Sequence, residues 1–387
     1  EIVFGDWSSD VCSSDLPLRA LANEKYLYFN STYKELSLNT LYCVGDQDIS
    51  PKMLERSDLI IMTYEKFDSY LRINRESKWI SEIATIIIDE IHIISDAKRG
   101  ARLESLIVQI FQHLKSPQII ALSATIGNPE KIADWLRFLE EKYCKKGFEC
   151  LIEEKRPIEL QYSFIMTESK NKEILKITNQ IIAQDGQILV FSNSRRDCEL
   201  MAFELKASLV PKLIDINYLI RYHALKYSFD PSYISQTIQE LIPYSVCFHH
   251  AGLNNAEKIL IESLYQKKII RLLMTTSTLS AGINTPARAI IIKDYQHYVF
   301  SDYSEGIEPQ AISKGKKIPI ERNLFHQICG RAGRPGFDES GLIFILINDI
   351  SERVWIEENY FKSNSNGKLI PLYDKLEIGR ASCRERV

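Results

Sequence analysis

Short apolar runs alternate along the chain with segments in which apolar residues recur every three or four positions. Buried strands are predicted for the runs at 58–63, 85–89, 118–123, 187–192, 244–249, 270–276, 289–293 and 341–347. Helices are predicted for the amphipathic segments at 101–114, 129–143 and 195–209. Strands that alternate with helices of this length indicate βαβ units, and therefore parallel sheets in an α/β fold.

A charged stretch, EEKRP at 153–157, interrupts this alternation and predicts a linker between two α/β halves. We expect the halves to span 17–155 and 156–350, with a helical, Tyr-rich insertion at 214–240 in the second half. The polar segment 295–318 is expected to be a long loop or a hairpin. Residues 351–376 are expected to begin a following domain.

The two ends of the chain differ in character from the rest. Both GDWSSDVCSSDL at 5–16 and EIGRASCRERV at 377–387 resemble translated sequencing adapters. We therefore expect 1–16 and 377–387 to be non-native and exclude them from the fold; natural polar termini are the alternative. The protein proper would then run from about Pro17 to about Leu376, as an internal fragment of a longer chain.

The composition is typical of a globular protein and excludes several classes, but it does not by itself indicate a function. The 387 residues are 45% hydrophobic and 26% charged, which is ordinary for a globular protein. No apolar run approaches the roughly 20 residues that span a bilayer. The net charge of −3 means that any nucleic-acid surface must be local. Eight cysteines without a CxxC pair favour reduced thiols and an intracellular protein over a disulfide framework or a zinc site.

The stretch TIIIDEIHIISD at 85–96 places two carboxylates directly after an apolar run. Ile86, Ile87 and Ile88 predict a strand that is covered on both faces. Ligands bind beyond the carboxyl ends of parallel strands, where Asp89 and Glu90 would lie. Asp89 suits Mg²⁺, and Glu90 suits a base that orients or deprotonates a water molecule, as in a nucleoside-triphosphate site.

Polar stretches also follow three other predicted elements. ALSATIGNP at 121–129 offers the hydroxyls of Ser123 and Thr125 ahead of a helix, with Asn128 expected as its N-cap and Pro129 as its first residue. TTSTLSAGINTPAR at 275–288 carries Gly282 and Asn284 after a strand. In QICGRAGRPG at 327–336 the guanidinium groups of Arg331 and Arg334 suit phosphate oxygens, and they would share one helical face if the turn continues.

Together and in this order, these stretches resemble the superfamily 2 helicases. DEIH at 89–92, SAT at 123–125 and QICGRAGRPG at 327–336 resemble the motifs named II, III and VI. The resemblance is greater to the Ski-like branch, which includes archaeal DNA-repair helicases, through PLRALANEKY at 17–26, TYEKFDS at 63–69, FHHAGL at 248–253 and GRAGRPGFDESG at 330–341. Tyr64 stands where that branch usually has proline.

The resemblance implies two tandem RecA-like domains with parallel sheets, the first truncated at its N-terminus, and ATP bound between them. Asp89 would bind Mg²⁺, Glu90 would be the general base, and Gln327, Arg331 and Arg334 would contact the γ-phosphate. Coupling residues would be His92, Ser123, Thr125, Gly282 and Asn284. The nucleic-acid track would comprise Pro17, Arg19, Thr63, Lys66, Ser192, Asn193, Arg195, Thr276 and Thr278. Such contacts go mainly to phosphates.

The phosphate-binding loop that these residues require is absent from the sequence. No G-x-x-x-x-G-K-[ST] occurs, and in the family this loop lies within roughly 30 residues ahead of the motif that begins here at Pro17. Truncation explains this absence better than loss of function, because Glu90 and Arg331 are both present. We therefore expect the 387-residue chain not to hydrolyse ATP, and the full gene product to do so.

Two further features have both a plain and a functional interpretation. His249 and His250 are adjacent, and neighbouring side chains on a strand point to opposite faces, so a shared metal ion is not expected. The segment 295–318 follows motif V, where the branch carries a strand-separating hairpin. Lys314, Lys316 and Lys317 would then touch the duplex junction; a mobile surface loop is the alternative.

The leading hypothesis is thus an ATP-dependent 3′-to-5′ DNA helicase of repair or recombination, acting as a monomer on single-stranded or forked nucleic acid without a membrane partner. A Ski-like RNA helicase is the alternative within the motor class, because the motor motifs contact phosphates in both. A non-catalytic nucleic-acid-binding module is the alternative outside that class. The presence of an upstream phosphate loop would distinguish a motor from such a module.

Overall fold

The structure is a computed structural model of the whole chain. It describes residues 2–6, 38–43, 49–73, 77–96, 99–115, 117–123, 126–153, 156–276, 286–299, 316–334, 336–363 and 368–376, together with 26, 29, 33 and 378. The chain divides into two compact units: unit 1 comprises 1–154 with 373–387, and unit 2 comprises 155–372.

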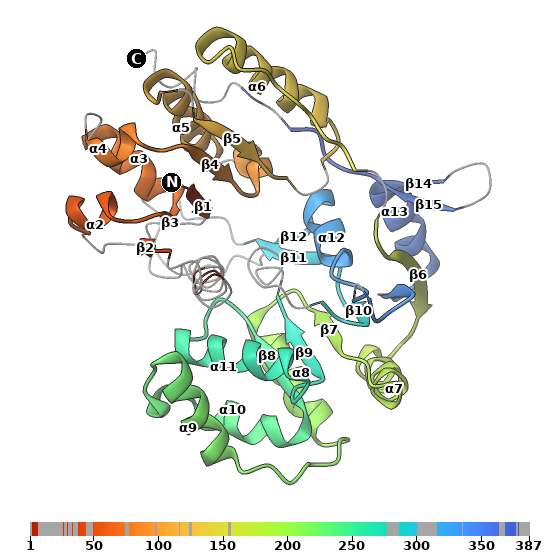
Figure 1. Ribbon diagram of the computed structural model, residues 1–387. Coiled ribbons are helices and arrows are strands. Elements are labelled where there is room, and N and C mark those ends of the chain that lie inside the picture. The colour runs from red at the N-terminus through yellow and green to blue at the C-terminus, as the bar shows by residue number, and fades with distance from the viewer. Residues whose placement is uncertain are drawn as a thin grey trace, which may run out of the picture. The chain divides into compact units, whose positions relative to one another are not determined.

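Unit 1 is built on a five-stranded sheet in which every pairing is parallel (Figure 1). The strand order is β2-β3-β1-β4-β5. The strands are β1 (Ile2–Asp6), β2 (Thr40–Cys43), β3 (Leu59–Thr63), β4 (Thr85–Ile88) and β5 (Gln118–Ala121). The central strand β1 falls in the segment 1–16 that sequence reasoning excluded from the fold, so that exclusion was wrong for residues 2–6 of the structure.

The helices of unit 1 leave some strand residues more exposed than the sequence predicted. They are α2 (Pro51–Glu55), α3 (Tyr64–Ile73), α4 (Lys78–Ser81), the 3₁₀ turn η2 (Ile91–Ser95), α5 (Gly100–His113) and α6 (Pro129–Tyr143). In β4, Ile86 and Ile88 are buried, but Ile87 between them is only half-buried. The expected strand covered on both faces is therefore wrong in the described residues. Ile120 of β5, at the edge of the sheet, is 37% exposed.

Unit 2 is built on a six-stranded parallel sheet with the order β6-β13-β10-β7-β9-β8. The strands are β6 (Glu159–Met166), β7 (Ile188–Phe191), β8 (Val246–His249), β9 (Leu272–Thr275), β10 (Ala289–Ile292) and β13 (Ser340–Ile347). All residues of β7, β8, β9 and β10 are buried. The parallel α/β class predicted for both halves is confirmed.

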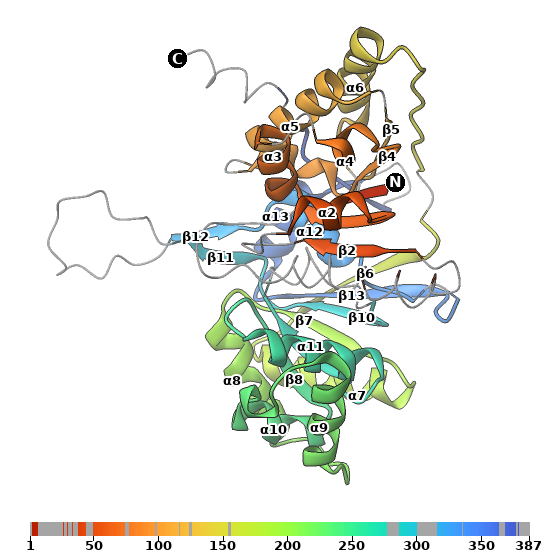
Figure 2. The ribbon, with the colours of Figure 1, turned by 60° about the vertical axis from the view of Figure 1, so that its left-hand side comes forward.

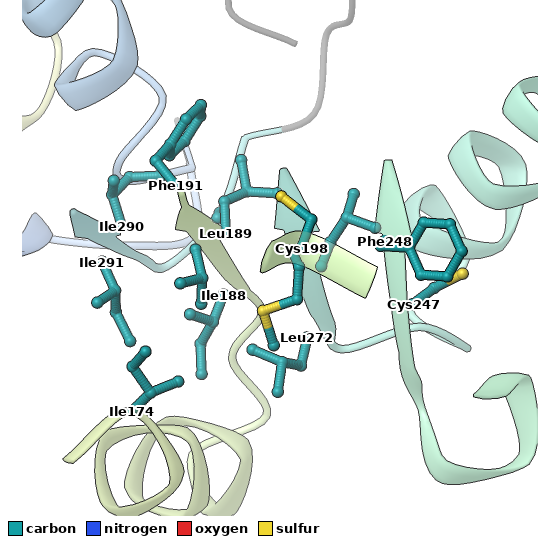
Figure 3. Close-up of a cluster of buried hydrophobic side chains, with 14 of the residues drawn as sticks. Ile174, Ile188, Leu189, Phe191, Cys198, Cys247, Phe248, Leu272, Ile290 and Ile291 are labelled. Atoms are coloured by element: carbon teal, nitrogen blue, oxygen red, sulfur yellow. The ribbon is translucent and has the colours of Figure 1, made fainter. Parts of the chain in front are cut away.

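The core of unit 2 lies between this sheet and its helices. Figure 3 shows Ile174 and Cys198, from two different helices, among strand residues that include Ile188 and Leu272. The helices are α7 (Lys170–Ala183), α8 (Arg195–Lys206), α9 (Ile216–Tyr227), α10 (Gln236–Leu241), α11 (Asn255–Gln266), α12 (Arg322–Cys329) and α13 (Ile350–Tyr360), with 3₁₀ turns η3 (Pro231–Tyr233) and η4 (Ile242–Tyr244). Helices α9 and α10 occupy the segment 214–240 that was expected to be a helical insertion.

A separate two-stranded antiparallel sheet lies at the ends of the segment 295–318. It consists of β11 (Gln296–Val299) and β12 (Lys316–Pro319), with Gln296 opposite Pro319 and Val299 opposite Lys316. In Figure 2 these strands extend sideways from the sheet of unit 2. Residues 300–315, including Lys314, lie outside the described residues.

The described residues after β13 lie within the two units of the chain. In α13, Ile356 and Tyr360 are 0% and 1% exposed and belong to the core of unit 2. The short strands β14 (Phe361–Ser363) and β15 (Leu369–Pro371) then pair with each other. From Tyr373 the chain belongs to unit 1, where Leu376 is 1% exposed. In the part of the chain that the structure describes, no helix is long and apolar enough to span a membrane.

Candidate nucleotide and nucleic-acid sites

The carboxylates Asp89 and Glu90 lie at the carboxyl end of β4, as the motif predicted. The backbone N–H of Glu90 donates to Asp89 Oδ1 over 3.0 Å. Glu90 has φ of +51° and ψ of 42°, a left-handed conformation that is uncommon for residues other than glycine. Such strain is typical of functional sites, because the surrounding structure must hold the residue in place.

Backbone bonds to the neighbouring strand hold this turn. The N–H of Leu122 donates to Ile88 O, and the N–H of Ile91 donates to Leu122 O, both over 2.8 Å. The turn that carries Asp89 and Glu90 is thereby fixed to the segment that carries Ser123. Ser123 is exposed at the same edge of the sheet, whereas Thr125 lies outside the described residues.

His92 lies within ion-pair distance of the proposed base. Its Nδ1 is 3.1 Å from Glu90 Oε2, and its side chain is 13% exposed against 36% for Glu90. This proximity places the His92 imidazole beside the Glu90 carboxylate. The structure thus brings Asp89, Glu90, His92 and Ser123 to one edge of unit 1.

The carboxylate of Asp89 suits a magnesium ion, because Mg²⁺ prefers oxygen ligands and is bound through one or two carboxylates together with phosphates and water. Among the described residues there is no group of three or more histidine, cysteine, aspartate or glutamate side chains that could hold a metal ion. A carboxylate at a strand end fits a Mg²⁺ ion whose other ligands are phosphate oxygens and water.

Two predicted track residues of unit 1, Thr63 and Lys66, lie at the carboxyl end of β3 and in the first turn of α3. Thr63, the last residue of β3, is 5% exposed, and the Nζ of Lys66 lies 5.5 Å from the centre of the Tyr70 ring. Helix α3 is fixed by Asp68, which accepts from Arg72 Nε over 2.9 Å and from Arg102 Nε over 3.0 Å. The predicted residues Pro17 and Arg19 lie outside the described residues.

In unit 2 the predicted track residues gather at the carboxyl edge of the sheet. The N–H of Ser192 donates to Thr275 O over 2.9 Å, and Ser192 Oγ donates to the carboxylate of Asp197. Lys293 Nζ donates to both oxygens of Asp197, over 2.7 and 2.6 Å.

These bonds hold Ser192 in place, while Arg195 begins α8 with an exposed side chain and Asn193 is half-buried. Thr276, directly after β9, is 8% exposed. Thr278, Gly282 and Asn284 lie outside the described residues.

The adjacent histidines at the end of β8 make separate contacts. His249 Nε2 is 2.9 Å from Glu262 Oε1 on α11, and His250 Nε2 is 2.9 Å from Glu199 Oε1 on α8. Burial lowers the pKa of His250, although the ion pair with Glu199 acts in the opposite direction.

The sequence analysis did not single out Lys258, which lies on α11 in the same region. It is 1% exposed, its Nζ donates to Ala251 O over 3.1 Å, and burial lowers its pKa to about 8.

The segment that carries Arg331 and Arg334 does not continue the helix, so the condition for a shared helical face is not met. Helix α12, which carries the half-buried Gln327, ends at Cys329. The chain then pairs with the segment ahead of β10: Ala287 N–H donates to Arg331 O over 3.0 Å, and Gly333 N–H donates to Ala287 O over 2.7 Å. Gly333 has φ of +87°, which glycine adopts readily.

Arg334 is bound by a carboxylate that the sequence analysis did not single out, Asp338 in the stretch FDESG. Arg334 Nε and Nη2 donate to the two oxygens of Asp338 over 2.8 and 3.0 Å, and Arg288 Nη1 donates to the same carboxylate over 3.0 Å. Burial would raise the pKa of Asp338, but these bonds outweigh it and hold the pKa below its ordinary value. The Asp338 side chain is only 3% exposed.

The predicted residues of unit 2 therefore form two groups. Ser192, Asn193, Arg195 and Thr276 follow strands, at the carboxyl edge, whereas Arg331 and Arg334 precede β13, at the amino edge. Because all strands of the sheet are parallel, these edges are opposite. The structure does not bring the two groups together within unit 2.

Comparison with known proteins matches both units to helicase families. Residues 15–132 match the DEAD/DEAH box helicase family, and residues 169–336 match the helicase conserved C-terminal domain. The chain is 35% identical over 370 residues to the ATP-dependent DNA helicase Hel308 of Pyrococcus horikoshii, covering 93% of this chain and 47% of that protein.

Two further relatives carry the same name. Identity is 33% to the protein of Caldivirga maquilingensis, over 90% of this chain and 45% of that protein. It is 31% to the protein of Methanococcus vannielii, over 92% of this chain and 48% of that protein. The chain thus spans about half the length of the curated relatives it matches. These matches confirm the resemblance found in the sequence, and the chain belongs to the superfamily 2 helicases, with a sequence similar to that of Hel308.

Proposed function

We propose that the chain is the motor core of an ATP-dependent DNA helicase that moves 3′ to 5′ in repair or recombination. One observation carries the proposal: the Asp89–Glu90 pair, with Glu90 in a left-handed conformation, is fixed to the Ser123 segment by two backbone bonds. The relatives named ATP-dependent DNA helicase support the choice of nucleotide and of nucleic acid.

The chemistry would be divided between the two carboxylates. Asp89 would hold Mg²⁺, which neutralises charge on the nucleotide phosphates when bound. Glu90 would accept the proton of the attacking water, and His92, 3.1 Å away, would fix the orientation of the Glu90 carboxylate. A general base of this kind contributes about 10²–10⁴-fold to the rate.

The second unit would contribute the charge that stabilises the transferring phosphate. We assign Arg331 and Arg334 to this role, with Gln327 beside them, because guanidinium groups form forked bonds to phosphate oxygens. Asp338 would act as a positioning residue, since it holds both Nε and Nη2 of Arg334. Thr125, Gly282 and Asn284 would couple the nucleotide to movement, together with Ser123.

A single strand would be held by phosphate contacts from Thr63, Lys66, Ser192, Asn193, Arg195 and Thr276, with Pro17, Arg19 and Thr278 completing the track. Such contacts position the strand without reading its sequence. The antiparallel pair β11–β12 would form the base of a strand-separating hairpin, with Lys314, Lys316 and Lys317 toward the junction. Forked DNA would then be the substrate, and a monomer would suffice.

The proposal is tested first by binding. Fluorescence anisotropy of a labelled single-stranded DNA should report binding that Arg195→Glu weakens and that the matched reversal Lys176→Glu, on α7, leaves unchanged. Lys176 is a suitable control because it is exposed in the same unit, 65% for its side chain. Unlabelled RNA that competes better than DNA would favour an RNA helicase.

Absence of binding would contradict the proposal. A non-catalytic binding module would bind but would not hydrolyse ATP even when a phosphate loop is supplied.

A further inference from the structure

Helix α9 lies outside every helicase motif described above, yet it presents an unusual surface. Its exposed side chains form one continuous stripe along the helix: Asn217, Tyr218, Arg221, Tyr222, Leu225 and Lys226. We name these six residues the α9 face. Two aromatic rings alternate with two cations, and Tyr218 and Tyr222 are 68% and 45% exposed. Helix α9 packs on α11 at the β8 side of unit 2 (Figures 1 and 2).

The two exposed rings are arranged for stacking. The centres of Tyr218 and Tyr222 are 6.4 Å apart, and their planes differ by only 25°. Two rings that are nearly parallel and this close together offer neighbouring faces on which bases can stack. Every base has an aromatic face, so this recognition tolerates any sequence.

Tyr222 is held in position from beneath. The Nζ of Lys267 lies 4.9 Å from the centre of its ring, and the ring of His223 packs edge-on against it with centres 5.2 Å apart. His223 is 0% exposed, and burial together with Lys267 and Lys226 lowers its pKa to about 4. Tyr227 fixes the end of the helix to α11 through a 3.2 Å bond with Ser263.

The charge of the α9 face is of one sign. It carries Arg221 and Lys226, with Lys267 beside it. The exposed N-cap residue Asp215 adds a carboxylate at the start of the helix, where it accepts the backbone N–H of Tyr218 over 3.0 Å. Neither Arg221 nor Lys226 forms an ion pair with a carboxylate among the residues that the structure describes. This contrasts with the whole chain, whose net charge is −3. A polyanion that carries flat rings is complementary to both features.

We propose that the α9 face is a second binding surface for single-stranded nucleic acid, separate from the motor track. Bases stack on Tyr218 and Tyr222, and phosphates lie against Arg221, Lys226 and Lys267. The inference rests on the proposed function for the class of partner. A surface of this kind would retain a strand while the motor track releases it.

The test measures the affinity of the 387-residue chain for fluorescein-labelled oligo-deoxythymidylate by anisotropy, over a range of salt. Tyr218→Ala with Tyr222→Ala should weaken binding at least tenfold, because stacking contributes about 1–3 kcal/mol per base. Arg221→Glu with Lys226→Glu should reduce the slope of log K against log salt by at least about 1.4, two phosphates at about 0.7 each.

The matched control is Lys172→Glu with Lys176→Glu, which reverses two exposed charges on α7 of the same unit. It should leave both affinity and slope unchanged. All substituted side chains are exposed, so we expect each variant to fold. A melting temperature equal to that of the wild-type chain shows that it does. The Arg195→Glu variant distinguishes the two sites. It should weaken binding at the motor track only, so the DNA binding that remains should be lost when the α9 substitutions are added to it.

Three outcomes overturn the proposal. If the α9 variants bind as wild type does while Arg195→Glu is weakened, the motor track stands and the α9 face does not bind DNA. If the wild-type chain binds no oligonucleotide, both the α9 proposal and the proposed function fail. If the wild-type chain dimerises and the α9 variants are monomers with unchanged DNA affinity, the face binds a second protein copy instead.

Discussion

The carboxylate of Asp338 accepts four hydrogen bonds, so its neutralisation should loosen the whole amino edge of the second sheet. Besides the three side-chain bonds from Arg334 and Arg288, it accepts the backbone N–H of Arg334 over 2.9 Å. Asp338→Asn keeps the shape of the side chain but removes its charge. The new NH₂ group is itself a donor and faces the N–H donors of Arg334 and Arg288, with which it cannot form hydrogen bonds.

The magnitude follows from burial. Asp338 is 3% exposed, whereas the side chains of Arg334 and Arg288 are 15% and 24% exposed. Breaking a fully buried ion pair costs about 3–5 kcal/mol, and the partly exposed arginines place this one at the lower end, about 3 kcal/mol. Since about 1.4 kcal/mol corresponds to a factor of ten, amide exchange in β13 should accelerate about 100-fold.

Hydrogen exchange followed by mass spectrometry measures this directly in peptides that cover β13. The matched control is Asp185→Asn, because Asp185 pairs with Lys268 and Arg271 ahead of β7 at the same edge but is 66% exposed. Exposed ion pairs contribute little, so exchange in the control should be unchanged. If Asp338→Asn left the exchange of β13 as slow as in wild type, the structural role assigned to Asp338 would be refuted.

The remaining predictions concern three other contacts. Asn128→Ala should speed amide exchange at 373–376 about 30-fold, since two hydrogen bonds to Leu376 at 2.6 and 3.0 Å together contribute about 2 kcal/mol; Asn128→Asp, which keeps the acceptor, should do less. Gly333→Ala should lower the melting temperature of unit 2, because φ is +87° and a Cβ would lie 2.6 Å from Ile158 Cγ2; an unchanged value would contradict the strain argument. Lys258 has a folded pKa of about 8, below its ordinary value of 10.5, because it is buried. The unfolded chain therefore binds more protons between these values, and wild-type stability relative to Lys258→Met should rise from about pH 8 to 10.5 in denaturant titrations; a fall would reverse the assignment.

Sequence patterns predicted those elements whose local signal agrees with their final burial. The eight predicted strands are all present, and helix α6 begins and ends where its amphipathic pattern indicated, at Pro129 and Tyr143. β6 was missed because its residues are alternately exposed and half-buried at the edge of the sheet. β1 was missed because the composition of 1–16 argued against any fold there.

The site was predictable in its residue types but not in its geometry. Motif spacing placed Asp89 and Glu90 correctly at a strand end, but it gave no signal for the left-handed backbone of Glu90. Asn128 is the N-cap residue of α6 and Pro129 its first residue, as predicted. The Asn128 side chain forms no capping bond, however, and instead binds the backbone of Leu376, 248 residues away in the sequence. Asp338 was overlooked because one acidic residue in a polar turn is ordinary, and only the fold shows that two arginines converge on it.

The central claim is that Glu90 is the base of an ATP-hydrolysing motor, and one rate tests it most directly. Residues 1–16 would be replaced by a helicase segment that carries G-x-x-x-x-G-K-[ST], and ATP hydrolysis would be measured with and without single-stranded DNA. We predict hydrolysis that DNA stimulates and that Glu90→Gln lowers about 10²–10⁴-fold while DNA binding persists. Hydrolysis at the same rate in Glu90→Gln, or none in the chain with the phosphate loop restored, would contradict the claim.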